Sequence, residues 1–347
     1  MSRGDRGVSR GTPREGRGSR AANRAAGAGR FGFFHVDVAA IADLTPSMRR
    51  FTFVGPGLDD FADPGRDQRI KLVLPAPSGG YEHLPDGEDW YERWRVLPEE
   101  RRNPIRTYPP RRVRPAGTTG AVDTAGAGAG GPTRVDVDMV VHEPLGPASR
   151  WIRDAAVGSR AVLLGPRRSW LRGRPPGAAL SGGVDFVPPA VTERFLLGGD
   201  ETAAPAIARI LQDLPTTARG IAVVEMPTRA DAAYLPDHPG FEVRVTGREG
   251  RAHGEALVEG VRRAAGELCP VGAAQEVEEI DVDHDLLWEV PRTARGGAAL
   301  RRTSLYAWLA GEAAAVRALR RHLVAERGVD RRSVAFMGYW RLGRAEN

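Results

Sequence analysis

The chain has 347 residues, more than one average domain holds, and this length suggests two domains. Its 50 basic and 44 acidic residues give a net charge of +6, and arginine supplies nearly all of the positive charge because Lys71 is the only lysine. The single cysteine, Cys269, excludes an internal disulfide, a Cys-rich zinc site and an iron–sulfur cluster.

A lone cysteine fits a reducing cytoplasm, and no apolar run approaches the roughly 18 residues that span a bilayer, so we expect a cytoplasmic protein without membrane insertion. Residues 1–30 are mostly arginine, glycine, serine and alanine, and we expect them to form a disordered tail. A basic tail can bind nucleic acid, but without aromatic residues among the arginines a solvated leader is the better interpretation.

Short strands separated by glycine and proline fill residues 31–190. Alternation of apolar and polar residues predicts strands at 33–38, 48–54, 68–74 and 135–142. We expect a long loop with a helical turn at 76–102 and a flexible Gly/Ala/Thr-rich insertion at 115–132. Such a series predicts an antiparallel barrel or sandwich.

Strands alternate with helices in residues 191–347. Apolar runs predict strands at 194–200, 220–225, 241–246, 305–309 and 333–340, the last of which closes the sheet. Helices are expected at 202–214 and 312–326, and the acidic segment 275–298 is expected to be loop-like. The fold class is therefore an α+β protein of two domains, an antiparallel barrel and then an open parallel α/β sheet.

The basic segment from Arg106 to Arg111 is a candidate flavin site. Alternate side chains of a strand share a face, so Arg106 and Tyr108 face a ligand together. A flavin needs an aromatic ring against its isoalloxazine, a donor to its N5 atom and cations at its diphosphate, and this strand offers most of these groups. A solvated basic edge strand is the alternative that the residues alone leave open.

Two further segments suit phosphate binding. In Gly146-Pro147-Ala148-Ser149, Ser149 is expected to cap a short helix whose first N–H groups cradle a diphosphate. Gly198-Gly199-Asp200-Glu201-Thr202-Ala203 joins a strand to a helix at the edge where open α/β sheets bind ligands. It is not a GxGxxG fingerprint, so each segment can equally be an ordinary helix start.

Together and in this order, these segments resemble the siderophore-interacting flavoproteins, which are ferric-siderophore reductases of the ferredoxin–NADP⁺ reductase superfamily. The resemblance spans about residues 31–347. Its most specific parts are Gly199-Asp200-Glu201-Thr202-Ala203 and Gly338-Tyr339-Trp340-Arg341. Other matching segments begin at Asp67, Arg106, Val135, Gly146, Leu164 and Trp308.

The resemblance implies a six-stranded antiparallel FAD barrel at 31–190 and an NAD(P)H-binding α/β domain at 191–347. It implies FAD and either NADPH or NADH as cofactors, and it assigns no catalytic residue and no metal ligand. The residues that would bind the cofactors are Arg106, Thr107, Tyr108, Pro109, Arg111, Asp138, His142, Gly146, Pro147, Ala148, Ser149, Asp200, Glu201, Thr202, Ala203 and Trp340.

Pro109 departs from the pattern of the family, which usually has threonine or serine after the tyrosine. Proline offers neither a hydroxyl nor an N–H to the flavin near N5. We therefore expect an altered redox potential and altered hydride acceptance.

The implied reaction carries electrons from NAD(P)H, or from a reduced carrier such as ferredoxin, through FAD to the iron of a ferric siderophore. Ferrous iron binds siderophore oxygens less tightly, so reduction releases the metal. Ferric siderophores are often anionic, and the residues expected to attract them are Lys71, Arg317, Arg320 and Arg321. The three arginines share one helix face, which can equally be a solvated basic face.

Two alternatives stay open beside the reductase. One is a generic NAD(P)H:flavin oxidoreductase or diaphorase, and the other is a flavin-containing siderophore-binding protein with little turnover. Trp340 either packs near the flavin or belongs to the core. The protein is expected to be a monomer.

Overall fold

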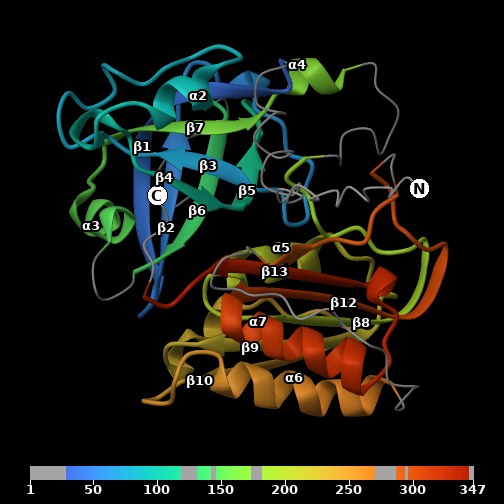
Figure 1. The fold of residues 1–347 in the computed structure, drawn as a ribbon. Coiled ribbons are helices and arrows are strands. Elements are labelled where there is room, and N and C mark those ends of the chain that lie inside the picture. The colour runs from blue at the N-terminus through green and yellow to red at the C-terminus, as the bar shows by residue number, and fades with distance from the viewer. Residues whose placement is uncertain are drawn as a thin grey trace, which may run out of the picture.

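A computed structural model of the chain defines residues 29–118, 131–141, 146–172, 182–269, 287–293 and 296–343. Nearly all of the predicted tail, most of the predicted insertion at 115–132, and His142 lie outside these residues. Within them, no helix combines the length and the apolar composition that crossing a bilayer requires. Two sheets follow each other along the chain (Figure 1).

Seven antiparallel strands form the first sheet, in the order β4-β3-β7-β1-β2-β6-β5. The strands are β1 (Phe31–Thr45), β2 (Met48–Val54), β3 (Ile70–Val73), β4 (Ile105–Tyr108), β5 (Pro110–Arg114), β6 (Arg134–Val140) and β7 (Arg160–Pro166). The helices of this domain are α2 (Trp90–Arg95), α3 (Pro147–Asp154) and α4 (Arg168–Leu171), with short 3-10 helices η1 (Leu58–Asp60) and η2 (Glu99–Arg101). Phe51 and Phe53 of β2 share a face and are fully buried, so the alternation that predicted this strand also builds its core.

The sheet has seven strands instead of the predicted six because Pro109 divides one strand. β4 pairs with β3, whereas β5 pairs with β6. Proline has no N–H to donate to a ladder, and the chain changes its pairing partner at this residue. Pro109 alone separates β4 from β5, so it links the two ends of the strand order, and the sheet curls into an antiparallel half-barrel (Figure 1).

Six strands form the second sheet, in the order β10-β9-β8-β12-β13-β11. The strands are β8 (Val191–Gly199), β9 (Gly220–Met226), β10 (Phe241–Gly247), β11 (Trp288–Glu289), β12 (Arg302–Glu312) and β13 (Val334–Trp340). Five of them are parallel, as the sequence predicts. The prediction that residues 333–340 close the sheet is wrong, because β11, from the segment expected to be a loop, adds an antiparallel edge strand.

Helices cover both faces of the second sheet. α5 (Ala204–Asp213) lies on the face toward the first domain, and α6 (Glu255–Leu268) and α7 (Ala313–Arg320) cover the other face (Figure 1). α7 continues as a π-helical segment, η5 (Arg321–Glu326), and the 3-10 helices are η4 (Arg229–Tyr234) and η6 (Arg331–Ser333). Leu197 of β8 packs in the core under α5, and Leu196 packs in the core under α6 and α7. β8 is thus buried on both faces, which explains its continuous apolar sequence.

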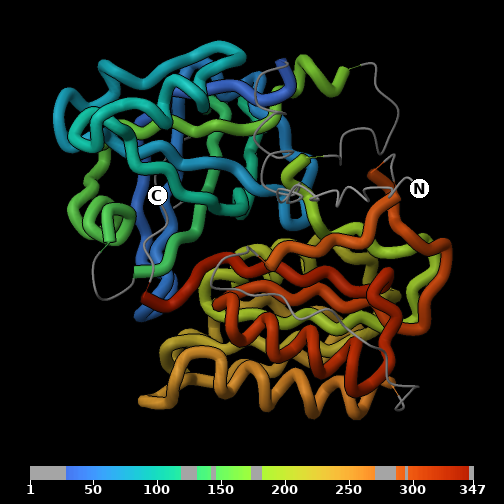
Figure 2. Tube along the Cα trace, viewed as in Figure 1, coloured from blue at the N-terminus to red at the C-terminus, as the bar shows by residue number. Residues whose placement is uncertain are grey.

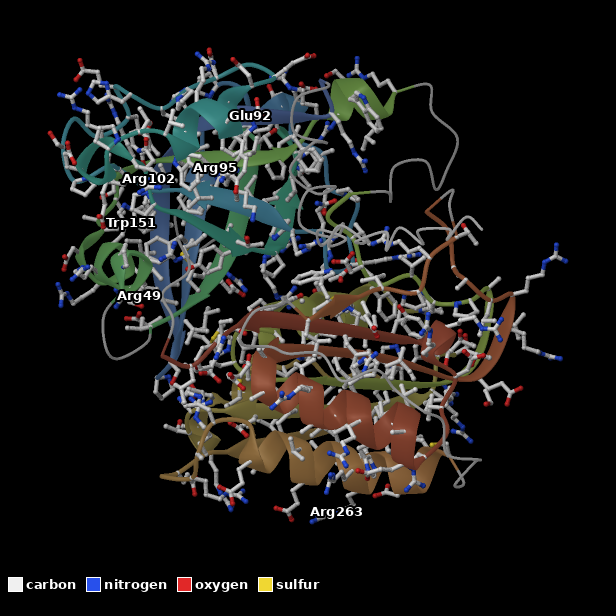
Figure 3. The ribbon with its side chains drawn as sticks, in the orientation of Figure 1. Arg49, Glu92, Arg95, Arg102, Trp151 and Arg263 are labelled. Atoms are coloured by element: carbon white, nitrogen blue, oxygen red, sulfur yellow. The ribbon has the colours of Figure 1, made fainter. Side chains whose placement is uncertain are left out.

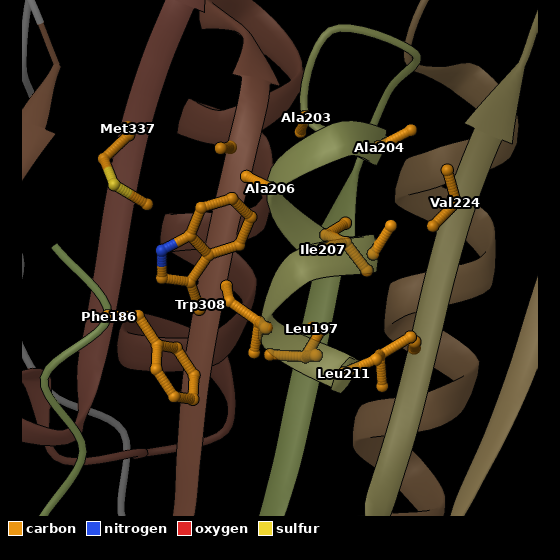
Figure 4. Packing of buried hydrophobic residues seen from close by; sticks show 14 of the residues in the cluster. Phe186, Leu197, Ala203, Ala204, Ala206, Ile207, Leu211, Val224, Trp308 and Met337 are labelled. Carbon is orange, nitrogen blue, oxygen red and sulfur yellow. The ribbon is translucent and has the colours of Figure 1, made fainter. Parts of the chain in front are cut away.

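A buried carboxylate of the first domain binds the segment that links the domains. Asp67 Oδ1 accepts the backbone N–H of Phe186 at 2.9 Å and of Asp185 at 3.0 Å. Its Oδ2 accepts the indole N–H of Trp308 at 2.9 Å, and Trp308 lies among Phe186 and Met337 in the core (Figure 4). Burial, and next the charge of Asp185, raise the pKa of Asp67 to about 6.

The hairpin between β1 and β2 also reaches the second domain (Figure 2). Asp231 Oδ1 accepts the hydroxyl of Thr45 at 2.6 Å and the N–H of Ser47 at 2.9 Å. Its Oδ2 accepts the hydroxyl of Ser47 at 3.0 Å and completes a capping box with Thr228 at the start of η4. Burial acts to raise the pKa of Asp231, but these hydrogen bonds outweigh it, and the pKa lies below its ordinary value.

We predict that Asp231→Asn lowers the free energy of unfolding at pH 7 by about 1–3 kcal/mol, because the amide nitrogen faces donors that then stay unsatisfied. The lowered pKa makes the wild-type carboxylate stabilising above about pH 4, the ordinary value of aspartate, and this stabilisation is lost as the pH falls through the folded pKa. Urea unfolding at pH 7 and at pH 3 measures both effects. The control Asp237→Asn changes an exposed acid of the same segment and should alter stability by less than about 0.5 kcal/mol. An equal loss in both variants contradicts the role of Asp231.

Candidate functional site

Strand β4 presents the predicted flavin residues at one end of the first sheet's strand order. Arg106 and Tyr108 lie opposite Leu72 and Ile70 of β3, two residues apart on one face, and both are half-buried. Among the described residues, the guanidinium of Arg106 has one hydrogen bond, to the carbonyl oxygen of Ile105 at 2.9 Å. Most of its N–H groups therefore remain available to an anion.

Arg111 and Asp138 connect the two domains. Asp138 on β6 is fully buried and accepts Arg50 Nε at 2.7 Å, Arg50 Nη2 at 2.8 Å and the hydroxyl of Tyr234 at 2.7 Å. Arg111 Nε lies 3.7 Å from Asp138, and its Nη1 donates to Gln212 of α5 at 2.5 Å. Burial, and next the carboxylate of Asp138, raise the pKa of Tyr234 well above its ordinary value, so the hydroxyl stays protonated and donates.

The predicted diphosphate cradle is the start of α3. The prediction that Ser149 caps this helix is wrong: Gly146 is the N-cap, and Ser149 is the third helical residue. Pro147 has no N–H, so the N–H groups of Ala148 and Ser149 are the first without an intrahelical acceptor. A Cβ placed on Gly146 would meet no described atom within 4 Å.

Two side chains hold α3 against the first sheet. The ring of Trp151 packs on Phe51 with 5.2 Å between centroids, and Arg49 Nη1 donates to the carbonyl oxygen of Ile152 at 3.2 Å (Figure 3). These contacts fix the position of α3 relative to β2.

Three of the segments that carry the resemblance converge on the carboxylate of Asp200, at the carboxyl end of β8. Oδ1 accepts the N–H of Thr202 at 2.9 Å and its hydroxyl at 2.5 Å. Oδ2 accepts the N–H of Glu312 at 2.8 Å and the indole N–H of Trp340 at 2.8 Å. Gly311 is required beside it, because its φ is +145° and a Cβ there would lie 2.6 Å from Asp200 Oδ2.

The residues that follow Asp200 turn inward. Glu201 is fully buried and binds Arg248, in the loop after β10, at 2.5 and 3.0 Å. Arg248 also lies 3.3 Å from Glu225 at the end of β9. Burial, and next the charge of Glu201, raise the pKa of Asp200 to about 6. Of the predicted residues from Asp200 to Ala203, Thr202 is the one that is not buried.

The four residues predicted to attract the substrate do not come together. Lys71 lies beside β4, where its Nζ donates to Thr107 Oγ1 at 2.6 Å. Arg320 is buried and bound to Glu289 at 2.9 Å, so the prediction that it belongs to an exposed basic face is wrong. Arg317 and Arg321 are exposed, but α7 lies on the face of its sheet turned away from the first domain (Figure 1).

Sequence reasoning missed Arg50, Tyr234, Glu225 and Arg248. Glu225 carried a signal, since a charged residue in a buried apolar strand needs partners. Tyr234 carried none, because its partner Asp138 is 96 residues away along the chain.

The groups gathered at β4 and α3 suit an aromatic dinucleotide. Arg106 is a cation with unused donors, the start of α3 adds N–H groups and the positive end of a helix dipole, and Tyr108 adds a half-buried ring. Tyr108 and Ala148 both pack against the hydrophobic core of the first domain. These residues fit FAD: Arg106 and the N–H groups of Ala148 and Ser149 would hold its diphosphate, and Tyr108 its ring.

Comparison with known proteins gives the same assignment for both domains. Residues 37–170 match the model of the siderophore-interacting FAD-binding domain, and residues 192–343 match that of the siderophore-interacting protein. An uncharacterized protein of Mycobacterium tuberculosis is 30% identical over 313 residues, which cover 89% of this chain and 90% of that protein. Ferric vibriobactin reductase ViuB of Vibrio cholerae is 25% identical over 304 residues, 87% of each chain.

Solved structures share the two-domain fold. The siderophore-interacting protein SipS from Aeromonas hydrophila matches with a TM-score of 0.56 and 25% identity, over 92% of this chain and 94% of that one. The ferredoxin reductase in carbazole 1,9a-dioxygenase, at 16% identity, matches with a TM-score of 0.50 over 89% of this chain and 70% of that one, which shows a ferredoxin reductase-like fold. The chain belongs to the siderophore-interacting protein family.

Proposed function

We propose that the protein is a flavin-dependent ferric-siderophore reductase. The observation that carries this proposal is the set of donors on Arg106 and at the start of α3, with the ring of Tyr108, in a chain with a siderophore-interacting FAD-binding domain. The relative named ferric vibriobactin reductase supports ferric siderophores as the substrate class. The single cysteine supports a reaction in the cytoplasm.

The chain's own residues bind and orient the reactants. Arg106 and the N–H groups at the start of α3 hold the diphosphate, and Tyr108 covers the ring and excludes water from it. When bound, FAD supplies redox chemistry that amino-acid side chains lack. Asp138 binds Arg50 and Tyr234 together, which keeps the second domain beside this region.

The iron is substrate, held by the oxygens of its siderophore. Those hard oxygen ligands bind ferrous iron less tightly than ferric iron, so one-electron reduction releases the metal. Lys71, beside β4, provides a positive charge that attracts an anionic ferric complex. The electron donor in this proposal is NADPH or NADH, with a reduced carrier such as ferredoxin as the alternative.

A second candidate is a general NAD(P)H:flavin oxidoreductase or diaphorase. Pro109 favours it, because a proline between β4 and β5 donates no hydrogen bond that would tune the flavin for iron reduction. A flavin-containing siderophore-binding protein with little turnover is the third candidate, for the same reason.

Anaerobic reduction of the purified holoenzyme tests the function. The protein is reduced with dithionite, freed of excess reductant and mixed with a ferric catecholate or ferric hydroxamate siderophore. We expect the flavin to reoxidise and a ferrous chelator to trap two Fe(II) per FAD. A colourless protein that FAD cannot reconstitute contradicts the proposal. Reduced flavin that yields no Fe(II) favours the binding protein, and transfer to quinones alone favours the diaphorase.

We predict that Arg106→Ala raises the dissociation constant for FAD roughly 10- to 150-fold, because a hydrogen bond from a charged group contributes about 1.5–3 kcal/mol. Fluorescence titration of the apoprotein with FAD measures the change. Arg112→Ala removes an exposed arginine of β5 and is the matched control, expected to shift the constant by less than about threefold. Similar weakening in both variants would mean that general positive charge, and not Arg106, attracts the cofactor.

We predict that Pro109→Thr speeds reduction of the bound flavin about two- to tenfold without changing flavin content. Threonine adds a hydroxyl and an N–H, and one hydrogen bond to the ring is worth about 0.5–1.5 kcal/mol. Stopped-flow absorbance with a dihydronicotinamide donor measures the rate. Pro110→Thr makes the same change on the opposite side of the strand and should leave the rate unaltered. An unchanged rate in Pro109→Thr removes this residue from the flavin's surroundings.

A further inference from the structure

The parallel strands of the second sheet have their carboxyl ends at one edge. An open α/β fold usually binds a dinucleotide at this edge. Its diphosphate rests there on free N–H groups at a helix start. Among the residues that the structure describes, three α-helices begin at this edge: α5, α6 and α7. In each of them, oxygens of the chain itself already accept the first N–H groups.

The start of α5 is closed by burial and by a backbone carbonyl. The N–H groups of Ala203 and Ala204 both donate to the carbonyl oxygen of Asp200, at 3.0 Å each. The next residue, Pro205, has no N–H. Ala203, Ala204 and Ala206 are fully buried, so no phosphate reaches this turn.

The starts of α6 and α7 are each closed by a buried carboxylate. Glu225 accepts the N–H of Gly254, the N-cap of α6, and that of Leu257, both at 2.9 Å. Glu312 accepts the N–H groups of the second and third residues of α7, at 2.7 and 3.0 Å. Each carboxylate thus stands where a bound phosphate would stand.

The same groups make this edge negative. Four buried acidic residues lie there: Asp200, Glu201, Glu225 and Glu312. Arg248 is already shared between two of them, and the exposed Arg229 pairs with Glu249 at 3.3 Å. A diphosphate would bring further negative charge within a few ångströms of these acids, and like charges at that range repel.

We propose that Asp200, Glu225 and Glu312 exclude the diphosphate of a nicotinamide dinucleotide from the second domain, so that a dihydronicotinamide donor reacts through its ring end alone. This inference rests on the proposed reductase function. Each dihydronicotinamide gives up one hydride, that is two electrons and one proton. Two ferric ions take one electron each, and the proton is released to water. The diphosphate and the adenosine then add little to donor recognition.

The test compares complete and truncated donors on the purified holoenzyme. NADPH, NADH and reduced nicotinamide mononucleotide, which has no diphosphate, should give kcat/KM values within about tenfold of one another. ADP-ribose should show no binding by calorimetry at concentrations up to about 1 mM. The inference is overturned if kcat/KM for NADPH or NADH exceeds that for reduced nicotinamide mononucleotide by more than about 100-fold. A Kd for ADP-ribose below about 0.1 mM overturns it as well.

Charge-neutral variants test the named residues. Glu225→Gln should lower the KM for NADPH roughly fivefold, since one repelling charge is removed, and leave the rate with the mononucleotide unchanged. Glu312→Gln makes the same test if Glu225→Gln does not fold. Glu259→Gln removes an exposed charge of α6 and should change neither value. An unchanged KM for NADPH in a folded Glu225 or Glu312 variant contradicts the role of these acids.

One further result separates this inference from the function on which it rests. If no dihydronicotinamide reduces the holoenzyme, but the dithionite-reduced protein still forms Fe(II), the inference is wrong and the reductase function stands. If the reduced protein forms no Fe(II), the function itself is contradicted.

Discussion

Buried carboxylates that accept hydrogen bonds from the opposite domain hold the two sheets in one arrangement, and the candidate site depends on it. Asp138 accepts a hydrogen bond from Tyr234, Asp231 accepts one from Thr45, and Asp67 accepts one from Trp308. Each carboxylate has all of its donors only when the domains are docked in this register. A shifted docking would take a donor from a buried charged group, which costs about 1–3 kcal/mol each time. The relative position of β4, α3 and the second sheet is therefore part of the fold.

Local patterns were enough to predict most of the strands. Alternation placed β2 correctly, and the apolar run before Asp200 predicted β8, because burial on one face or both is written in neighbouring residues. The sequence does not show that the chain changes its pairing strand at Pro109, since this change depends on which strands flank β4 and β5. β11 is two residues long and carries no periodicity. α6 was not predicted, although its buried residues recur at the spacing of an amphipathic helix.

The candidate site was predictable in part, and the errors have physical causes. Ser149 has the chemistry of a helix cap, but Pro147 prefers the first helical position and so makes Gly146 the cap. Arg320 fits an exposed basic face by spacing, yet Glu289 of the unpredicted β11 binds it. Glu289 is distant from Arg320 along the chain, and a single sequence does not show which distant residues become neighbours in the fold.

Net charge alone does not say where this protein binds anions. The chain has a net charge of +6, but the two domains differ. Arg106 and the start of α3 offer donors in the first domain, whereas carboxylates lie at the carboxyl ends of strands in the second. A GxGxxG loop brings a phosphate close to a helix start whose N–H groups lack partners. In this chain the backbone carbonyl of Asp200 and the carboxylate of Glu225 already accept hydrogen bonds from those N–H groups. A glycine-rich loop would therefore bring a phosphate to N–H groups that already have partners. Gly311 instead lets the backbone approach Asp200, whose carboxylate accepts the indole N–H of Trp340.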